Sequence, residues 1–415
     1  MNKKYTFIDL FAGCGGLSLG LEQAGFHPVY VNELNKDAMA TYLDNRKEYP
    51  LLHDKRFHSY DIHELTKKKK LESLTKNLKK ELNLKKRDIS LIVGGPPCQG
   101  YSGIGHRRSY KIDKKDIKSN YLYKEMVKVI KYIEPKAFIF ENVKGLISGR
   151  WSKKGKKGEI FKDVLKEFKT LKNYFQDFVL IQSKNYGVPQ NRPRIFLIGI
   201  RKDQKFSENL FMTANGMFPE PETNAYPNLI DLLGDLVDKN YEKTFITNVY
   251  TSSPKNDLQK KLRMKKNNKN YFRKGEKITD HEYSKHSPRI VKKFEYMLSN
   301  EGKITNKMKT KKFAQRLTFP KWKKDGPNIT ATSLPDDYVH FSQPRSFTVR
   351  EWARLQMFPD WYTFEGKRTT GGLRRAGNNK DVTERELPKY TQIGNAVPVE
   401  LARRIGLHIK KLLKN

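Results

Sequence analysis

The amino-acid sequence predicts an α/β protein, in which a doubly wound, mostly parallel sheet of seven strands precedes a second, smaller basic domain. Three observations lead to this prediction. Short apolar runs alternate with stretches of helical spacing through the first half of the chain, as in strands joined by helices. The alternation stops after Arg201, where lysine and arginine become dense. The length of 415 residues also exceeds the usual size of one domain.

The first predicted strand is the apolar run YTFIDL, which ends at Leu10. The glycine-rich turn FAGCGG follows it. Helical spacing of Leu17, Leu21 and Ala24 then predicts a helix over residues 17–26. A strand, a glycine turn and a helix in this order form the first unit of the expected sheet.

Six further strands are expected at apolar runs along the next part of the chain. They cover residues 28–33, 57–61, 89–95, 136–142, 177–190 and 193–201. Helices are expected over 37–45 and 122–133. The lysine-rich stretch between them places its leucines on one face, which predicts a surface helix with a solvated basic side. These leucines are Leu71, Leu74, Leu78 and Leu82.

Beyond Arg201 we expect boundaries that divide the chain into residues 1–201, 202–323 and 324–415. The basic middle part does not repeat the strand–helix alternation. Apolar order returns at SFTVREWARLQMF, where we expect an amphipathic helix that organises the basic region against the first domain. The chain ends in a second amphipathic helix, over residues 398–413.

The net charge of +38 favours a polyanionic partner, with nucleic acid preferred to an anionic membrane. A lysine-rich solvated surface is the alternative. No apolar run reaches the roughly 18 residues that a membrane helix needs. The only cysteines, Cys14 and Cys98, are too few for a disulfide framework, and no Cys/His cluster has zinc spacing. We therefore expect a protein of a reducing cytoplasm, without a metal.

The turn FAGCGG lies where α/β proteins bind nucleotides, at the carboxyl end of the first strand. Glu33 ends the next strand, where a carboxylate can accept hydrogen bonds from ribose hydroxyls. Asp61 ends the third strand and suits an adenine amino group. The turn does not match G-x-G-x-x-G, so these residues fit S-adenosylmethionine as well as NAD. Glycines that merely shape a turn are the third possibility.

Cys98 stands in the stretch GGPPCQGYS, directly after the fourth strand. It could be a packing residue, a metal ligand or a nucleophile. The prolines hold the thiol at the carboxyl end of its strand, at the edge that also carries the glycine turn. Glu141 ends the adjacent predicted strand, and Arg192 and Arg194 precede another. Nearby guanidinium groups can lower the pKa of a thiol, which favours a nucleophile.

Six stretches together resemble the cytosine-C5 DNA methyltransferases of bacterial restriction–modification systems. They are FIDLFAGCGGLSLGLEQAGF, GGPPCQGYS, ENVKGL, QNRPRIFLIGIR, RSFTVREWARLQMFPDWY and QIGNAVPVELARRI, in the order of the family. The resemblance covers nearly the whole chain except residues 202–323. It implies a Rossmann-like fold of the S-adenosylmethionine-dependent methyltransferases, with residues 202–323 as the target-recognition domain and 324–415 completing the catalytic domain.

The resemblance also implies a catalytic role for each motif. Cys98 would attack C6 of a cytosine, and Glu141 would protonate or hydrogen-bond N3. Glu141 should therefore have a raised pKa in a desolvated site. Arg192 and Arg194 would clamp the base and the thiolate. The methyl group would pass from S-adenosylmethionine to C5, with the cytosine flipped out of the duplex.

The cofactor site carries over from the resemblance in the same way. Phe11 would lie against the adenine, the turn backbone near the methionine part, Glu33 on the ribose and Asp61 near the adenine amino group. The full expected set is Phe11, Ala12, Gly13, Gly16, Glu33, Asp61, Ile62, Pro97, Leu122, Asn395 and Val397. The last two lie in the segment that returns from the C-terminus, so the final helix should pack on the first domain. Cys14 is expected to be structural.

The implied partner is double-stranded DNA, bound by a monomer without membrane contact. A cognate restriction endonuclease would act as a separate protein, and the enzyme would work in the bacterial cytoplasm, at the nucleoid. The polar stretch over residues 100–120 would be a loop that closes over DNA, or else a disordered surface loop.

Three other functions remain to be weighed. RNA-directed relatives carry a Cys-Phe-Thr signature that a chain with only Cys14 and Cys98 lacks. A catalytically idle DNA-binding protein would not need Cys98, Glu141 and the two arginines together. An NAD-dependent oxidoreductase gives no reason for the pairing of Cys98 with Glu141.

Overall fold

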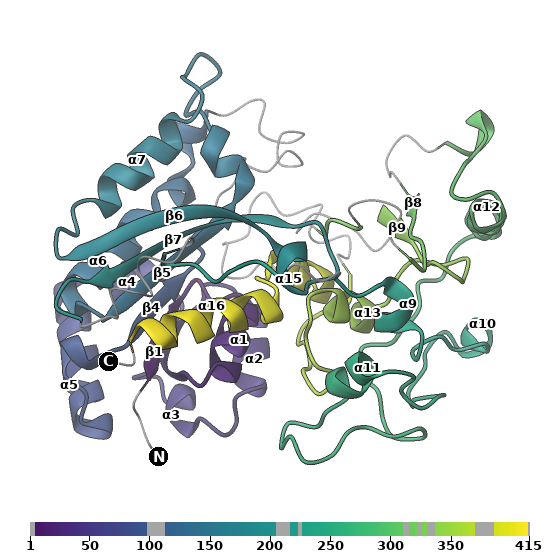
Figure 1. Ribbon diagram of the computed structural model, residues 1–415, viewed down its shortest axis with the longest axis horizontal. Coiled ribbons are helices and arrows are strands. Elements are labelled where there is room, and N and C mark those ends of the chain that lie inside the picture. Colours follow the sequence, from purple (N-terminus) through teal and green to yellow (C-terminus); the bar gives the residue numbers. More distant parts are fainter. Residues whose placement is uncertain are drawn as a thin grey trace.

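The protein is described by a computed structural model that covers residues 5–97, 113–204, 216–222, 226–309, 315–321, 326–329, 337–369 and 386–413 (Figure 1). Cys98 and most of the polar stretch over residues 100–120 lie outside the described residues.

The described residues contain a seven-stranded sheet, which confirms the predicted α/β fold with a sheet of seven strands, while the second domain stays a prediction (Figure 1). Its strands are β1 (Thr6–Leu10), β2 (His27–Asn32), β3 (His58–Ser59), β4 (Leu91–Gly94), β5 (Ala137–Val143), β6 (Tyr174–Gln182) and β7 (Pro193–Arg201). Their order is β3-β2-β1-β4-β5-β7-β6. The first five strands are parallel, whereas β7 runs antiparallel to both β5 and β6. The strand order reverses between β1 and β4, where open α/β sheets bind their ligands.

Helices cover both faces of the sheet because alternate strand residues point to opposite sides. On one face, Ile8 and Ile92 share a core with α4 (Ile62–Leu65), α5 (Lys68–Leu82), α6 (Tyr123–Ile133) and α7 (Glu159–Phe168). On the other face, Phe7 packs with α1 (Gly16–Gln23) and α16 (Val399–Leu412). The predicted leucine face of α5 is confirmed, with Leu71, Leu74 and Leu78 buried.

The C-terminal helix packs on α1, in agreement with the expectation that it packs on the first domain. A Cβ atom placed on Gly20 of α1 would meet the Val399 carbonyl oxygen at 2.4 Å and the Ala402 Cβ at 2.5 Å. The two helices therefore approach so closely that only glycine fits at this position. This contact places the last helix of the chain beside the first helix, which directly follows β1 and its glycine turn.

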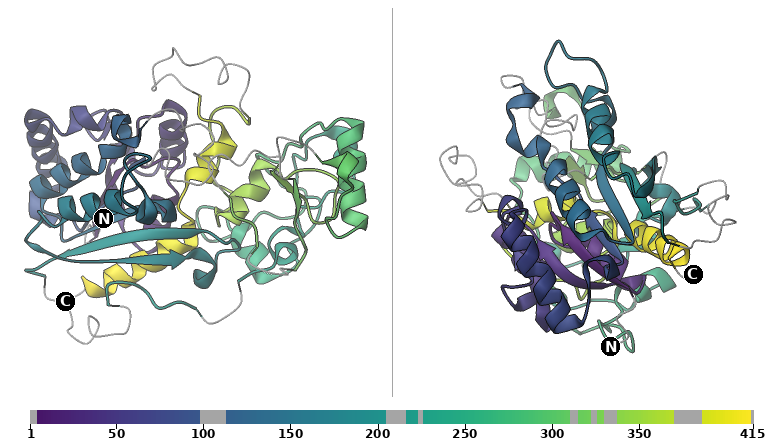
Figure 2. Two further views of the ribbon diagram at one scale, coloured as in Figure 1. Left: turned by 90° about the horizontal axis from the view of Figure 1, so that it is seen from above. Right: turned by 90° about the vertical axis from the view of Figure 1, so that its left-hand side faces the viewer.

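The remaining elements, apart from short 3₁₀ turns, lie between or beyond these layers. They are α2 (Lys36–Asp44), α3 (Pro50–His53), α9 (Leu229–Leu233), α10 (Tyr241–Thr244), α11 (Asp257–Leu262), α12 (Pro288–Ser299), β8 (Arg316–Leu317), β9 (Tyr338–Val339), α13 (Val349–Leu355) and α15 (Lys389–Asn395). Figures 1 and 2 show that the segment from α9 to β9 extends away from the sheet. Its core is nevertheless continuous with Cys14 and Leu19 beside the first turn.

The helix α13 differs from the prediction. We expected an amphipathic helix, but all seven of its residues are buried. Its charged side chains are instead neutralised inside the protein: Arg354 lies 2.6 Å from Asp235 and from Asp360, and Glu351 lies 2.7 Å from Arg345. The buried pairs connect α13 to the Asp235 segment, which follows α9, and thereby fix the basic region against the return segment.

Candidate functional site

Four segments meet at one edge of the sheet. The strands β1, β4 and β5 are parallel, so the turn after Leu10, the segment after Gly94 and the end of β5 at Val143 lie along the same edge. Because β7 is antiparallel to β5, its first residues reach this edge too, and Val143 pairs with Arg194. The sheet thus brings together the motifs that sequence analysis placed at a common site.

Glu141 and Arg194 form a buried ion pair at this edge. Arg194 Nε lies 2.9 Å from Glu141 Oε1, and Glu141 is only 8% exposed. Burial raises the pKa of Glu141, and the positive charges of Arg194 and Arg192 only partly oppose this effect. The direction of this pKa shift is the one expected from the sequence.

The segment that leads into Cys98 lies directly against this carboxyl group. A Cβ atom placed on Gly95 would stand 2.9 Å from Glu141 Oε2. The side-chain amide of Asn142 donates a hydrogen bond of 3.1 Å to the Pro96 carbonyl. The backbone three residues before Cys98 is therefore held beside Glu141, while Pro97 is exposed. Cys98 itself lies outside the described residues.

Arg192 faces a different set of partners from Arg194. Its fully buried guanidinium donates hydrogen bonds to the backbone carbonyls of Gly394 (2.7 Å), Ala396 (3.0 Å) and Ile329. The side chain thus holds the return segment against the start of β7. Its expected contact with the base and the thiolate stays a prediction.

The glycine turn is built around Glu33. The carboxylate accepts hydrogen bonds of 2.8 Å from the backbone N–H groups of Gly13 and Asn35. Burial raises the pKa of Glu33, and these two hydrogen bonds lower it. Since an ionised carboxylate has about four acceptor positions, Glu33 can order the turn and still accept from a ligand hydroxyl.

The turn also has the shape of a ligand cradle. Phe11, Ala12 and Gly13 are partly exposed between the buried strand β1 and the buried helix α1. Phe11 adopts a left-handed φ of 58°, which is unusual for an aromatic residue and is often found at functional positions. A Cβ atom on Gly13 would meet nothing within 4 Å, so the backbone is open to a ligand there.

The return segment reaches this turn. A Cβ atom on Gly16 would stand 2.5 Å from the Val397 carbonyl oxygen. Val397 is buried, and Asn395 is exposed at the end of α15. The structure therefore brings residues separated by most of the chain to the same edge.

The other expected cofactor residues lie at helix starts. Asp61 is exposed and caps α4, its carboxylate accepting a hydrogen bond of 2.8 Å from the His63 N–H, whereas Ile62 is buried. Leu122 is half-buried just before α6. Their cofactor contacts stay predictions.

Sequence reasoning missed a buried polar cluster behind the turn. Asp9 accepts a hydrogen bond of 2.5 Å from Ser18 Oγ, and burial raises the pKa of Asp9 to about 7. Nearby, Arg46 pairs with Glu22 at 2.6 Å and donates to the Tyr362 hydroxyl, which donates in turn to the Cys14 carbonyl. Ser18 and Tyr362 lie within the quoted motifs, whereas no sequence signal pointed to Arg46. Cys14 itself is buried, with its pKa raised to about 12, as expected of a structural thiol.

Among the described residues, no group of three or more His, Cys, Asp or Glu residues could hold a metal ion. No helix among them is long and apolar enough to cross a membrane.

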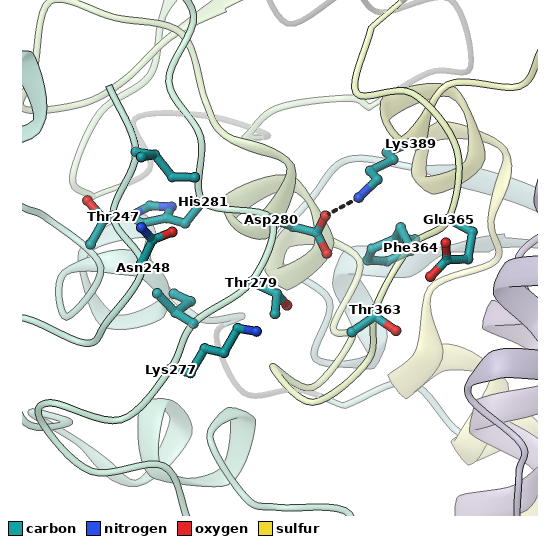
Figure 3. Close-up of a pocket in the computed structure, with 12 residues that line it drawn as sticks. Thr247, Asn248, Lys277, Thr279, Asp280, His281, Thr363, Phe364, Glu365 and Lys389 are labelled. Atoms are coloured by element: carbon teal, nitrogen blue, oxygen red, sulfur yellow. Dashed lines mark hydrogen bonds and ion pairs between the residues drawn. The ribbon is translucent and has the colours of Figure 1, made fainter. Parts of the chain in front are cut away.

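A pocket of about 330 Å³ lies elsewhere, between residues 246–248 and 277–281 on one side and 363–365 and Lys389 on the other (Figure 3). Lys389 Nζ lies 2.7 Å from Asp280 Oδ1 across it. None of the predicted site residues lines this pocket.

Comparisons with known proteins show the family. The family model described as C-5 cytosine-specific DNA methylase matches residues 5–411. The chain is 30% identical to the Type II methyltransferase M.DdeI of Desulfomicrobium norvegicum, over 99% of this chain and 89% of that protein. It is 28% identical to the Type II methyltransferase M1.HphI of Haemophilus parahaemolyticus, over 99% and 88%.

Solved structures show the same fold. A prophage-encoded DNA modification methyltransferase from E. coli matches with a TM-score of 0.67 at 23% identity, over 99% of this chain and 100% of that one. The methyltransferase EhMeth of Entamoeba histolytica matches with a TM-score of 0.53 at 15% identity, over all of both chains.

The fold and the family match together define an enzyme of the methyltransferase class. More particularly, the chain belongs to the family of C-5 cytosine-specific DNA methylases. The resemblance stated from the six motifs is confirmed, and an NAD-dependent oxidoreductase is excluded.

Gly95→Ala tests whether the site depends on the contact between Gly95 and Glu141. The added Cβ would push the carboxyl group away from Arg194, and a shift of about 1 Å at a catalytic group can cost roughly 100-fold in rate. We expect a loss of methylation of that order with an unchanged melting temperature. The control is Ser148→Ala, an exposed position shortly after β5, which should keep full activity. Full activity of Gly95→Ala would contradict the geometry.

Proposed function

We propose that the enzyme transfers a methyl group from S-adenosylmethionine to C5 of a cytosine flipped out of a specific sequence in double-stranded DNA, through a covalent bond between Cys98 and C6. The observation that carries this proposal is the buried Glu141–Arg194 pair, against which the Gly95–Pro96 backbone leads directly into Cys98. The proposed reaction needs a nucleophile, a protonatable carboxyl group and a guanidinium group; Glu141 and Arg194 supply the last two beside the backbone that leads into Cys98.

The proposed chemistry activates the cytosine ring from two sides. As the Cys98 thiolate forms a bond to C6, the ring electrons move toward N3, which takes a proton from Glu141. C5 becomes a nucleophile and forms a bond to the methyl carbon, whose bond to the sulfonium sulfur breaks to leave S-adenosylhomocysteine. The C5 proton then passes to water, the electrons of the C5–H bond restore the C5–C6 double bond, and Cys98 leaves C6 as a thiolate, while N3 returns its proton to Glu141. The raised pKa of Glu141 supports this role, because a carboxyl group must be protonated to donate.

Arg192 and Arg194 would contribute differently. Arg194 forms an ion pair with Glu141, and it would orient this carboxyl group and contact the base. Arg192 would act as a positioning residue through the carbonyls of the return segment, in addition to the contact with the base and thiolate expected from the family. Base flipping is required because the C6 face of a stacked cytosine is closed to the thiol.

The cofactor turn fits an adenosine ligand without phosphates. The cradle residues Phe11, Ala12 and Gly13, with Gly16 behind them, would surround it, and Glu33 would accept from ribose hydroxyls. Asp61, Ile62, Pro97, Leu122, Asn395 and Val397 would complete the pocket. S-adenosylmethionine supplies an electrophilic methyl group when bound there.

The remaining assignments concern the domains, the DNA substrate and the cellular setting of the enzyme. We assign target recognition to residues 202–323 and the catalytic domain to 1–201 and 324–415. The charge of +38 suits the phosphates of duplex DNA. As the relatives named Type II methyltransferases suggest, the enzyme would be the modification partner of a separate restriction endonuclease. It would act as a monomer in the bacterial cytoplasm, at the nucleoid.

Expression of the chain in a methylation-deficient bacterium tests this function. We expect bisulfite sequencing of the genomic DNA to find 5-methylcytosine at one short recurring sequence. Cells that express Cys98→Ser are the control and should give none. Unmodified cytosines across the genome in cells that contain folded wild-type protein would contradict the proposal.

The pH dependence of the rate tests the role of Glu141. Because its pKa is raised and its protonated form donates, the rate at saturating substrates should fall as pH rises through that pKa. Glu141→Gln cannot exchange a proton, so its rate should fall by about 10²- to 10⁴-fold and lose this alkaline decline. A variant that keeps the wild-type pH profile would exclude Glu141 as the proton donor.

A further inference from the structure

A strongly basic loop follows the strand that carries Glu141. This basic loop, residues 149–157, joins the 3₁₀ helix η5 (Lys144–Ser148) to α7. It contains five exposed cations and no acidic residue. None of the five takes part in an ion pair within the described part of the chain. The cations are Arg150, Lys153, Lys154, Lys156 and Lys157.

Ring stacking and hydrogen bonds hold the basic loop in place. The Trp151 ring stacks on Tyr121, with centroids 4.8 Å apart and an interplanar angle of 8°. The Trp151 indole N–H donates to Asp163 Oδ2 at 2.6 Å. A hydrogen bond of 3.1 Å from the Gly158 N–H to the Gly149 carbonyl joins the two ends of the loop. The loop is thus fixed to the first turns of α7 and to the segment before α6.

The acidic residues next to the loop do not neutralise its lysines. Glu159 accepts hydrogen bonds from the backbone N–H groups of Trp151 and Lys156, and Asp163 accepts from the indole. Glu159 therefore holds the loop backbone and Asp163 holds the Trp151 ring, and the lysine side chains are exposed to solvent. The positive charges of the loop are therefore free to interact with an external anion.

The basic loop lies at the catalytic edge of the sheet. It begins after β5 and η5, and five residues of a 3₁₀ helix rise only about 10 Å. A hydrogen bond of 3.3 Å from the Lys115 N–H to the Trp151 carbonyl connects it to the segment that precedes α6. Figure 1 shows the loop standing clear of the sheet beyond the start of α7.

We propose that the basic loop binds phosphates of the duplex that flanks the flipped cytosine. The identity of the polyanion rests on the proposed function. A duplex carries one negative charge per roughly 1.7 Å of its axis, so DNA presenting a base to Glu141 places phosphates within reach of side chains at the same edge. Lysines contact phosphates as point charges, so this contact is independent of sequence and adds affinity without adding specificity.

Lysines near the end of α5 supply a matched control. Lys76, Lys79, Lys80 and Lys85 are also exposed, and none takes part in an ion pair within the described ranges. The C-terminal end of α5 leads to the first residue of β4, so Lys79, Lys80 and Lys85 lie toward the opposite edge of the sheet. Removing four charges from either place changes the net charge equally.

The experiment compares two quadruple variants with the wild-type enzyme. One replaces Lys153, Lys154, Lys156 and Lys157 with Gln, and the other replaces Lys76, Lys79, Lys80 and Lys85 with Gln. The affinity for a fixed duplex is measured between about 50 and 200 mM salt. For each lysine that contacts a phosphate, the slope of log affinity against log salt should fall in magnitude by about 0.9.

We expect this loss only in the basic-loop variant, together with a higher KM for DNA and an unchanged kcat at saturating DNA. Equal slopes in the two variants would overturn the proposal, since net charge alone would then explain both. Methylation by the wild-type enzyme is measured in parallel. Its absence would contradict the proposed function, whereas the difference in salt slopes would still decide whether the basic loop binds the duplex.

Discussion

The antiparallel direction of β7 is the constraint on which the candidate site depends. Because β7 runs against β5, its first residues lie at the edge where β5 ends, and Arg194 meets Glu141 at 2.9 Å. A parallel β7 would begin at the opposite edge and would carry Arg194 away from Glu141. The contact of Glu141 with Gly95 comes from the parallel pairing of β4 with β5, and burial raises the pKa of Glu141 against the opposing charge of Arg194.

The second requirement is that the end of the chain returns to its beginning. Glycines at positions 16 and 20 let the backbone of residues 397–399 approach α1, and Arg192 holds the carbonyls of Gly394 and Ala396. The buried pairs of Arg354 extend this support to the region that follows α9. Removing one partner of a buried ion pair typically costs about 3–5 kcal/mol, so these contacts make the site and the basic region one structural unit.

The sequence predicted the strands, the leucine face of α5 and the meeting of Glu141 with Arg194, because periodicity and strand ends are local signals. Three features could not be predicted in this way. The partners of Arg192 are backbone carbonyls, which any sequence supplies. The burial of α13 depends on Asp235 and Asp360, whose positions follow from tertiary packing. The role of Glu33 in ordering the turn depends on the Gly13 N–H, which carries no sequence signal.

The proposed mechanism requires a covalent bond between Cys98 and the target cytosine, with Glu141 as the group that would activate the ring. A duplex in which fluorine replaces the C5 hydrogen of the target cytosine tests it most directly, since the step that expels Cys98 needs loss of that hydrogen. With S-adenosylmethionine present, intact-mass analysis should find protein joined to methylated DNA, and peptide mapping should place the bond on Cys98. Turnover of natural DNA by an enzyme that forms no such adduct would contradict the account.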